Sequence, residues 1–331
     1  MRKQPILQVK NLKTYFHTDS GTVKAADDVS FDVYPEETLG IVGESGCGKS
    51  ITCMSIMQLV ETPPGKYEGG EILFDGIDIM KASKRQIMDI RGNQISMIFQ
   101  EPMTSLNPVF RVADQIAEAI MVHQNVNKKD AEEQAVDMLR KVGIPNPERV
   151  ARDFPFALSG GMRQRVMIAM ALACKPKILI ADEPTTALDV TIQAQVLQLM
   201  NDLKDDYQTS VIFITHDLGV IAEMSDRVMV MYAGKIVELA DVEELFTTPK
   251  HPYTIGLMKS KPDMSTTGDR LTVIQGNVPN LNRLPSGCAF HPRCPYVMDI
   301  CKEETPDLRD ISATRKAACW KVFQEKEVSY E

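Results

Sequence analysis

The chain has 331 residues, of which 44% are hydrophobic and 25% charged, and its net charge is −8 at pH 7. This composition is typical of a soluble globular protein, and the length allows one substantial core with a compact extra module. The negative charge argues against non-specific nucleic-acid binding, which needs a basic face.

The N-terminal segment, residues 1–5, is basic but is not followed by the apolar core of a secretory signal. No stretch approaches the roughly 20 apolar residues that a membrane span needs. The longest apolar run, Val166 to Cys174, has nine residues and predicts a buried helix segment. We therefore expect an intracellular protein that reaches a membrane only through partner proteins.

The first part of the chain is rich in strand-forming residues. Predicted strands lie at 6–9, 26–33, 38–42, 71–74 and 94–99. A glycine-rich turn follows the third of them and opens a predicted helix from Lys49 to about Val60.

From about Pro102 to Phe156 the pattern becomes helical, with amphipathic stretches separated by Asn, Pro and Gly. We expect a helical subdomain over about 102–164, inserted between two halves of an α/β core. Helices at 161–173 and 192–205 then alternate with strands at 177–181 and 210–215. This alternation is typical of a largely parallel sheet covered on both faces.

Proline recurs and the apolar periodicity fades after about Lys250. The change predicts a domain over 1–250 and a small, loop-rich C-terminal module over 251–331. No internal repeat indicates a second copy of the α/β core.

Residues 43–50 match the phosphate-binding P-loop pattern, directly after an apolar strand and at the start of a helix. Glycines let the backbone wrap around phosphate oxygens, and the helix N-terminus adds a partial positive charge. Lys49 is expected to contact the β- and γ-phosphates, and the Ser50 hydroxyl to ligate Mg²⁺. A glycine-rich turn without a ligand is the alternative. The predicted nucleotide-binding residues are Gly43, Glu44, Ser45, Gly46, Cys47, Gly48, Lys49 and Ser50.

Two acids, Asp182 and Glu183, end a predicted buried strand. Such a strand end lies beside the P-loop in α/β nucleotide-binding sheets, where Asp182 could hold Mg²⁺ through water. Glu183 is the better candidate for polarising the attacking water. A strand end with two solvated acids is the alternative, and the P-loop makes it the weaker one.

Leu158–Arg165, with the sequence Leu-Ser-Gly-Gly-Met-Arg-Gln-Arg, resembles the signature motif of ABC cassettes, which other P-loop ATPases lack. The Ser159 hydroxyl and the N–H groups of Gly160 and Gly161 at a helix N-terminus suit a γ-phosphate. An N-capped helix start without a ligand is the alternative.

The other ABC motifs stand in the order that the family requires. Gln100 resembles the Q-loop glutamine, which senses Mg²⁺ and the attacking water. Asp189, after Ala187-Leu188, resembles the aspartate of the D-loop. His216 resembles the switch histidine that contacts the γ-phosphate. Phe16 occupies the usual place of the aromatic residue that stacks on adenine, with Tyr15 as its competitor and a core role as the alternative.

The resemblance covers roughly residues 6–245 and implies an ABC-type cassette with a RecA-like core, an N-terminal antiparallel β region and a helical subdomain. It also implies that two cassettes close head to tail on two ATP molecules, so that Ser159 and Gly161 serve the partner's nucleotide. The implied partners are a second ATP-binding subunit, in a homodimer or heterodimer, two transmembrane permease subunits and, indirectly, an extracytoplasmic solute-binding protein. The implied location is peripheral, on the cytoplasmic face of the cell membrane.

Longer stretches narrow the match to the ATPase subunits of oligopeptide/dipeptide permeases. They are Phe99–Pro108, Asp182–Thr191, His251–Thr254 and Leu284–Pro295. The resemblance implies ATP-driven uptake of di- or oligopeptides, with nickel or oligosaccharides as alternative solutes. A soluble non-transport ABC ATPase and a catalytically silent regulatory cassette are two further alternatives. The first usually has a coiled-coil insertion or a second cassette, and Glu183 and His216 argue against the second.

Four cysteines in the tail are separated by five, six and seventeen residues: Cys288, Cys294, Cys301 and Cys319. Four thiolates suit zinc or an iron–sulfur cluster. The absence of Cys-x-x-Cys pairs and the family resemblance favour a [4Fe–4S] cluster with a structural role, and zinc or plain thiols and disulfides remain alternatives. His291 lies among these cysteines in the sequence and could replace one of them as a ligand, but we expect it to pack or form hydrogen bonds in the loop.

Two local expectations concern the surroundings of the P-loop. Cys47, beside Lys49 at a helix N-terminus, should have a lowered pKa and raised reactivity. Glu36 stands where the family usually has Gly, so its turn is expected not to need a positive φ.

Overall fold

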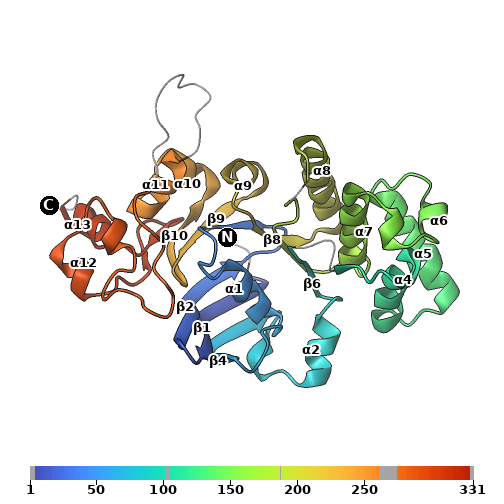
Figure 1. Ribbon diagram of the computed structural model, residues 1–331, viewed down its shortest axis with the longest axis horizontal. Coiled ribbons are helices and arrows are strands. Elements are labelled where there is room, and N and C mark those ends of the chain that lie inside the picture. Colours follow the sequence, from blue (N-terminus) through green and yellow to red (C-terminus); the bar gives the residue numbers. More distant parts are fainter. Residues whose placement is uncertain (1–3, 101–104, 187, 261–273, 329–331) are drawn as a thin grey trace. The chain divides into compact units, whose positions relative to one another are not determined.

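The computed structural model describes residues 4–100, 105–186, 188–260 and 274–328 (Figure 1). The chain divides into two compact units. The first contains Lys81–Ile214 together with the short segments Met1–Ile6 and Val33–Thr38. The second contains Leu7–Asp32, Leu39–Met80 and Thr215–Glu331. The sequence predicted a boundary near residue 250 between a large domain and a C-terminal module, which differs from this division into compact units and stays a prediction.

Three parallel strands form the sheet of the first unit. They are β6 (Ile95–Ile98), β7 (Ile178–Asp182) and β8 (Ser210–Ile214), with β7 between the other two. All residues of these strands are buried. Short, continuously apolar strands buried on both faces are typical of parallel sheets, as the alternation of strands and helices predicted.

Four helices of the first unit, α2, α5, α7 and α8, begin at polar residues whose side chains cap them. The side chains of Ser83, Asn127, Ser159 and Asp189 each accept a hydrogen bond from a backbone N–H in the first turn of a helix. The helices are α2 (Lys84–Ile90), α4 (Val112–His123), α5 (Lys128–Lys141), α6 (Pro147–Val150), α7 (Gly160–Leu172) and α8 (Val190–Tyr207), with a 3₁₀ turn η2 at Pro155–Ala157. Helices α4 and α5 pack against each other and against α7. This group occupies the region for which the sequence predicted a helical subdomain.

The second unit contains an antiparallel sheet in the order β2, β1, β4, β5. Its strands are β1 (Leu7–Thr18), β2 (Gly21–Val33), β4 (Gly65–Phe74) and β5 (Ile77–Asp78), followed by the 3₁₀ turn η1 (Ile79–Lys81). The predicted N-terminal antiparallel region is therefore present, with longer strands than the sequence pattern indicated.

A second group of strands in this unit runs in the order β3, β9, β10, β12, β11. The pair β3 and β9 is parallel, and the later pairs are antiparallel. The strands are β3 (Thr38–Val42), β9 (Arg227–Tyr232), β10 (Lys235–Asp241), β11 (Arg309–Asp310) and β12 (Lys316–Ala317). The helices near them are α1 (Lys49–Ile56), α9 (Leu218–Met224) and α10 (Val242–Thr247).

The C-terminal extension packs onto this second group of strands. Its elements are α11 (Pro252–Lys259), the 3₁₀ turn η3 (His291–Arg293), α12 (Asp299–Glu303) and α13 (Trp320–Val328), besides β11 and β12. Strand β12 pairs with β10 through Glu238 opposite Ala317 and Leu239 opposite Lys316. The rings of Tyr232, Tyr253 and Phe290 contact one another, with centroids 4.7–5.5 Å apart. The extension therefore shares its core with the strands that precede it.

The turn before β3 corrects one expectation. Glu36 has a φ of 67°, so the prediction that this turn needs no positive φ was wrong. The Glu36 N–H donates to Ser210 Oγ at 2.9 Å, and the Glu37 carbonyl accepts from the Val211 N–H at 2.8 Å. These bonds to the start of β8 hold the turn in a conformation that glycine would adopt at lower cost.

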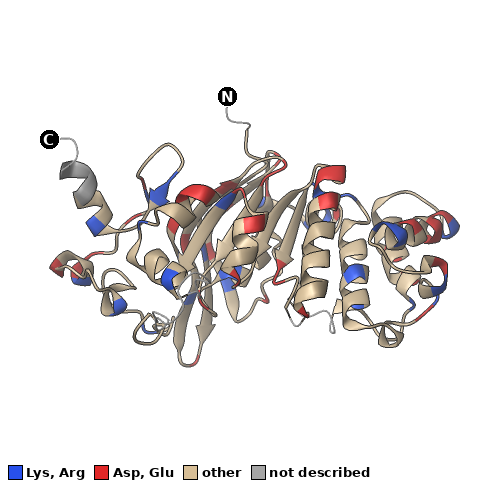
Figure 2. Cartoon of the chain, turned by 90° about the horizontal axis from the view of Figure 1, so that it is seen from above, with Lys and Arg blue, Asp and Glu red and all other residues tan. Residues whose placement is uncertain are grey.

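Charged residues of both signs are interspersed along the described chain (Figure 2). Among the helices that the structure describes, none is long and apolar enough to cross a membrane.

Candidate nucleotide site

The P-loop lies in the second unit, between the buried strand β3 and helix α1. Gly43, Gly46 and Gly48 have φ values of 153°, 77° and 106°, a range that side-chain-bearing residues rarely adopt. A Cβ at Gly43 would lie 2.3 Å from the Met231 carbonyl oxygen, and one at Gly48 would lie 2.0 Å from that of Ala25. The loop therefore needs glycine at both positions to pack against the neighbouring backbone.

The Lys49 ammonium curls back over the loop. Its side chain is largely buried, and Nζ donates to the carbonyl oxygens of Gly43 at 2.8 Å and Glu44 at 3.2 Å. The ammonium is thus held inside the loop by two backbone carbonyls. Exchanging these partners for phosphate oxygens would keep the charge satisfied by hydrogen bonds.

Cys47 corrects a second expectation. The side chain is buried, with 1% of its surface exposed, and burial raises the pKa of the thiol although Lys49 acts in the opposite direction. The prediction of a lowered pKa and raised reactivity was wrong because it considered the neighbouring charge and not the burial.

The two aromatic residues near the start of the chain point to opposite faces of strand β1, as successive strand residues do. The Tyr15 hydroxyl donates to Asp27 Oδ1 at 2.5 Å, and Lys24 lies 5.5 Å from the centre of the Tyr15 ring. Phe16 is half-buried and lies near Gly65. Tyr15 is therefore engaged with charged residues, and Phe16 presents a plain hydrocarbon ring.

His216 also belongs to the second unit, where it is exposed directly before α9. The adjacent Asp217 caps that helix by accepting from the Gly219 N–H at 2.8 Å. The cap fixes the start of the helix and so the backbone that carries His216.

The carboxylates Asp182 and Glu183 lie at the end of β7 in the first unit. Asp182 is buried. Glu183 has a φ of 48°, its N–H donates to the Ile214 carbonyl at 2.9 Å, and its Oε2 accepts from Thr186 Oγ1 at 2.8 Å and Gln100 Nε2 at 3.1 Å. The structure thus brings Gln100 and Glu183 together, as the family resemblance implied for two residues of one reaction site.

The signature motif begins helix α7, also in the first unit. Ser159 Oγ accepts from the Met162 N–H at 3.3 Å, while Ser159 and Gly160 are exposed. A Cβ at Gly161 would lie 3.0 Å from the Ile192 side chain of α8, so this position needs a small residue. The N-capping role that we weighed as the alternative is present, and it leaves the helix N-terminus open to solvent.

Asp189 is the cap of α8, where Oδ1 accepts from the Ile192 N–H at 3.0 Å. Ala187 of the same predicted D-loop and Glu101–Thr104 of the Q-loop stretch lie outside the described residues. The predicted site residues therefore form two sets. Gln100, Ser159–Gly161, Asp182, Glu183 and Asp189 are in the first unit, and Phe16, Gly43–Ser50 and His216 are in the second.

Residues of the C-terminal extension reach the P-loop, which the sequence did not predict. The Glu44 N–H donates to Tyr253 Oη at 2.9 Å, and the Glu44 carboxylate forms a two-pronged ion pair with Arg293. Both partners lie in stretches that we used only to recognise the family. The tail is about as rich in charged and aromatic residues as the rest of the chain, so its composition did not single them out.

The four tail cysteines line one small cavity together with aromatic and histidine side chains. About 20 Å³ of free space remains there, enough for a single ion or water. Burial is the main cause that raises the pKa of Cys288 to about 11, and the nearby Cys294, Cys301 and Cys319 contribute to the same rise. Among the described residues, however, no three Cys, His, Asp or Glu side chains are arranged to hold a metal ion. His291 Nδ1 lies 3.0 Å from the Cys288 carbonyl, which agrees with its expected role in the loop.

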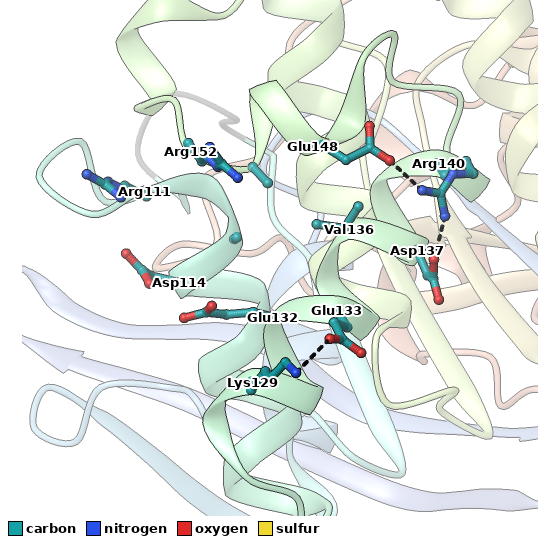
Figure 3. Close-up of a pocket in the computed structure, with 12 residues that line it drawn as sticks. Arg111, Asp114, Lys129, Glu132, Glu133, Val136, Asp137, Arg140, Glu148 and Arg152 are labelled. Atoms are coloured by element: carbon teal, nitrogen blue, oxygen red, sulfur yellow. Dashed lines mark hydrogen bonds and ion pairs between the residues drawn. The ribbon is translucent and has the colours of Figure 1, made fainter.

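A separate cavity of about 640 Å³ lies among α4, α5 and α6 (Figure 3). Several of its charged lining residues pair with one another: Arg140 forms ion pairs with Asp137 at 2.5 Å and Glu148 at 2.6 Å, and Lys129 with Glu133 at 3.9 Å. None of the predicted nucleotide-binding residues lines it.

Comparisons with known proteins agree with this picture. The "ABC transporter" family profile matches residues 26–186, and the profile "Oligopeptide/dipeptide transporter, C-terminal region" matches residues 237–301. The solved ATP-binding cassette MJ0796, a dimer in a post-hydrolysis state bound to ADP and Pi, superposes with a TM-score of 0.64 at 26% identity. The match covers 71% of this chain and 98% of that one.

Curated relatives match over nearly the whole chain. A probable peptide ABC transporter ATP-binding protein from Sinorhizobium fredii is 53% identical, over 96% of this chain and 95% of its own. The oligopeptide transport ATP-binding protein AppD of Bacillus subtilis is 51% identical, over 95% and 96%. The corresponding protein OppD of Salmonella typhimurium is 49% identical, over 97% and 95%.

Fold, P-loop and signature together define an ATP-binding cassette with ATPase activity. The chain belongs to the ABC transporter family, among the ATP-binding proteins with the oligopeptide/dipeptide transporter C-terminal region.

Proposed function

We propose that this chain hydrolyses ATP to power the import of di- or oligopeptides across the cytoplasmic membrane. The observation that carries the proposal is the 51–53% identity, over 95–97% of the chain, to ATP-binding proteins of peptide and oligopeptide transport. The similarity includes the C-terminal region at residues 237–301, whereas the MJ0796 cassette covers 71% of this chain. We place the chain peripherally at the cytoplasmic face of that membrane.

The active form needs partners. The dimeric state of the similar cassette MJ0796 supports a pair of cassettes, either two copies of this chain or this chain with a related subunit. In such a pair the P-loop of one cassette and Ser159–Gly161 of the other would enclose each ATP. Two permease subunits would carry the peptide across the membrane, and a solute-binding protein would deliver it from outside.

Within one cassette the roles follow the chemistry of the side chains. Lys49 and the loop N–H groups would bind the β- and γ-phosphates, and Phe16 would stack on adenine. Ser50, Asp182 and Gln100 are the oxygen donors for Mg²⁺, which would offset phosphate charge. Glu183, oriented by Thr186 and Gln100, would accept a proton from the attacking water, and His216 would donate a hydrogen bond to the γ-phosphate.

The solute is tested by reconstituting the chain with its membrane subunits and solute-binding protein in lipid vesicles. We expect a peptide mixture to raise ATP hydrolysis and to accumulate inside, while the same amino acids in free form do neither. Stimulation by nickel or an oligosaccharide, and not by peptides, would reject the peptide assignment and leave the motor role intact.

We also propose that Cys288, Cys294, Cys301 and Cys319 hold a [4Fe–4S] cluster that stabilises the extension. Convergence of the four thiols on one cavity supports this, as does the matched C-terminal region. Their mutual electrostatic repulsion when ionised would be relieved by a bound cation. A cube of four irons is larger than the present space, so it requires the lining loops to move apart, and the thiols would have to rearrange to ligate zinc as well.

Elemental analysis of protein purified without oxygen distinguishes the alternatives. We expect about four irons and four sulfides per chain. Cys301→Ser should lower both contents, and Cys174→Ser, which replaces a cysteine outside the cavity, should leave them unchanged. If the protein contains zinc and no sulfide, the site is a zinc site and not an iron–sulfur cluster. If it contains neither iron nor zinc, the proposal of a metal site is rejected.

A further inference from the structure

Arg293 of the C-terminal extension forms a two-pronged ion pair with Glu44 of the P-loop. Nη1 lies 2.7 Å from Oε2, and Nη2 lies 3.0 Å from Oε1. The Arg293 side chain is 5% exposed and that of Glu44 26%, so the pair is largely screened from water. Both residues belong to the second unit.

Every nitrogen of the Arg293 guanidinium is engaged. Besides Glu44, Nε donates to the Gln275 carbonyl at 3.1 Å, Nη2 to the Ile274 carbonyl at 3.4 Å and Nη1 to Tyr232 Oη at 3.2 Å. The guanidinium carbon also lies 5.8 Å from the centre of the Tyr232 ring. A planar fork fixed on so many sides is a preorganised partner for a carboxylate.

Glu44 in turn is held at three points. Its carboxylate binds Arg293, its N–H donates to Tyr253 Oη at 2.9 Å, and its carbonyl accepts from Lys49 Nζ at 3.2 Å. One residue thus joins the extension to the lysine that would contact the phosphates. The position and charge of this residue should therefore influence nucleotide binding.

The charge matters because ATP is a polyanion. Burial is the main cause of the raised pKa of the Cys47 thiol, and the Glu44 carboxylate adds a smaller contribution in the same direction, so its charge acts on the interior of the loop. Without a counter-charge it would also repel phosphate groups entering the loop. The bound guanidinium supplies that counter-charge from the far end of the sequence.

We propose that Arg293 is a positioning residue for nucleotide binding, which neutralises Glu44 and holds the P-loop in its ATP-accepting conformation. The proposal rests on the proposed function only in that the loop binds ATP, and it is independent of the transported solute. It also gives the extension a role in ATP binding, since turn η3, which carries Arg293, lies between Cys288 and Cys294 of the thiol-lined cavity.

The test is a double-variant cycle on the full chain, with the dissociation constant of the non-hydrolysable analogue AMP-PNP measured by calorimetry. Arg293→Gln should raise that constant about tenfold, because it leaves an uncompensated carboxylate beside the phosphates. Arg283→Gln, which removes an exposed charge from the same extension, should change it little. Added salt should reduce the difference between Arg293→Gln and the unchanged protein, since it screens the repulsion.

The decisive variant is Arg293→Gln combined with Glu44→Gln. Removing the carboxylate should restore binding to within about threefold of the unchanged protein, as expected when one charge compensates another. A double variant that binds as weakly as Arg293→Gln alone, in protein that melts at the unchanged temperature, would overturn the proposal. So would an Arg293→Gln protein with unaltered affinity. Binding of AMP-PNP by the unchanged chain is the separate check on the proposed function.

Discussion

Replacing Glu183 by Gln is expected to lower the rate of ATP hydrolysis by about 10²–10³-fold, because an amide cannot accept the proton of the attacking water. The substitution keeps the shape of the side chain, and an amide oxygen can still accept from Thr186 and Gln100, which now bond to Oε2. Binding of MgATP should therefore survive or tighten. Phosphate release and equilibrium nucleotide binding, measured on the same preparation, separate the two effects.

A matched control is Glu223→Gln, which removes an exposed carboxylate from α9. Its hydrolysis rate should stay within twofold of the unchanged protein, about the noise of such comparisons. If Glu183→Gln hydrolyses ATP like the parent, the proposed role of Glu183 is wrong. If Glu183→Gln also loses nucleotide binding, the Glu183 carboxylate is needed to bind MgATP and not only to hydrolyse it.

Removing the buried charge of Arg315 is expected to cost about 3–5 kcal/mol of unfolding free energy, since it leaves the buried Glu238 carboxylate without its cationic partner. Arg315 is 1% exposed and Glu238 is fully buried, with Arg315 Nε 3.8 Å from Glu238 Oε1 and 3.2 Å from Glu244 Oε1. The guanidinium also donates to the carbonyls of Thr248 and Glu244, both at 2.6 Å. Chemical unfolding of Arg315→Met, followed by fluorescence, measures the loss.

The loss should depend on pH. Burial raises the pKa of Glu238, and the positive charge of Arg315 opposes that rise. Removing Arg315 therefore moves the pKa of Glu238 in the folded state further above its value in the unfolded state. A carboxyl group with a raised folded pKa favours folding in acid and loses that contribution as the pH rises. The Arg315→Met variant should therefore lie closest to the parent near pH 5 and fall furthest behind at pH 8.

Two further variants check this account. Arg315→Met with Glu238→Gln should recover much of the lost stability, because no buried charge is left alone. Lys316→Met changes the next residue, whose side chain is 47% exposed and forms an ion pair with exposed Asp310, and should cost less than about 0.5 kcal/mol. Equal losses at positions 315 and 316 would contradict the role of burial.

Local patterns carried most of the fold prediction. The buried strands β6, β7 and β8 are short and mostly apolar, and the caps of α7 and α8 are Ser159 and Asp189, so short segments contain the information. The same holds for the P-loop, because the glycines that its close packing requires are part of its pattern.

Features that arise only when distant segments pack could not be predicted. The raised pKa of Cys47 follows from burial, which the adjacent Lys49 does not reveal. The positive φ of Glu36 is held by Ser210, a residue 174 positions away. The pairing of Arg293 with Glu44 spans 249 positions, and no periodicity in the sequence connects them.

The pairing of β12 with β10 determines which edge of the sheet a shortened chain would expose. Strand β10 has β9 on one side and the two-residue β12 on the other. A chain that ended before Lys316 would leave unpaired N–H and C=O groups along β10, a template onto which a strand of another molecule could add. Strand β12 pairs with Glu238 and Leu239 of β10, so the extension covers this part of the edge that β10 would otherwise present.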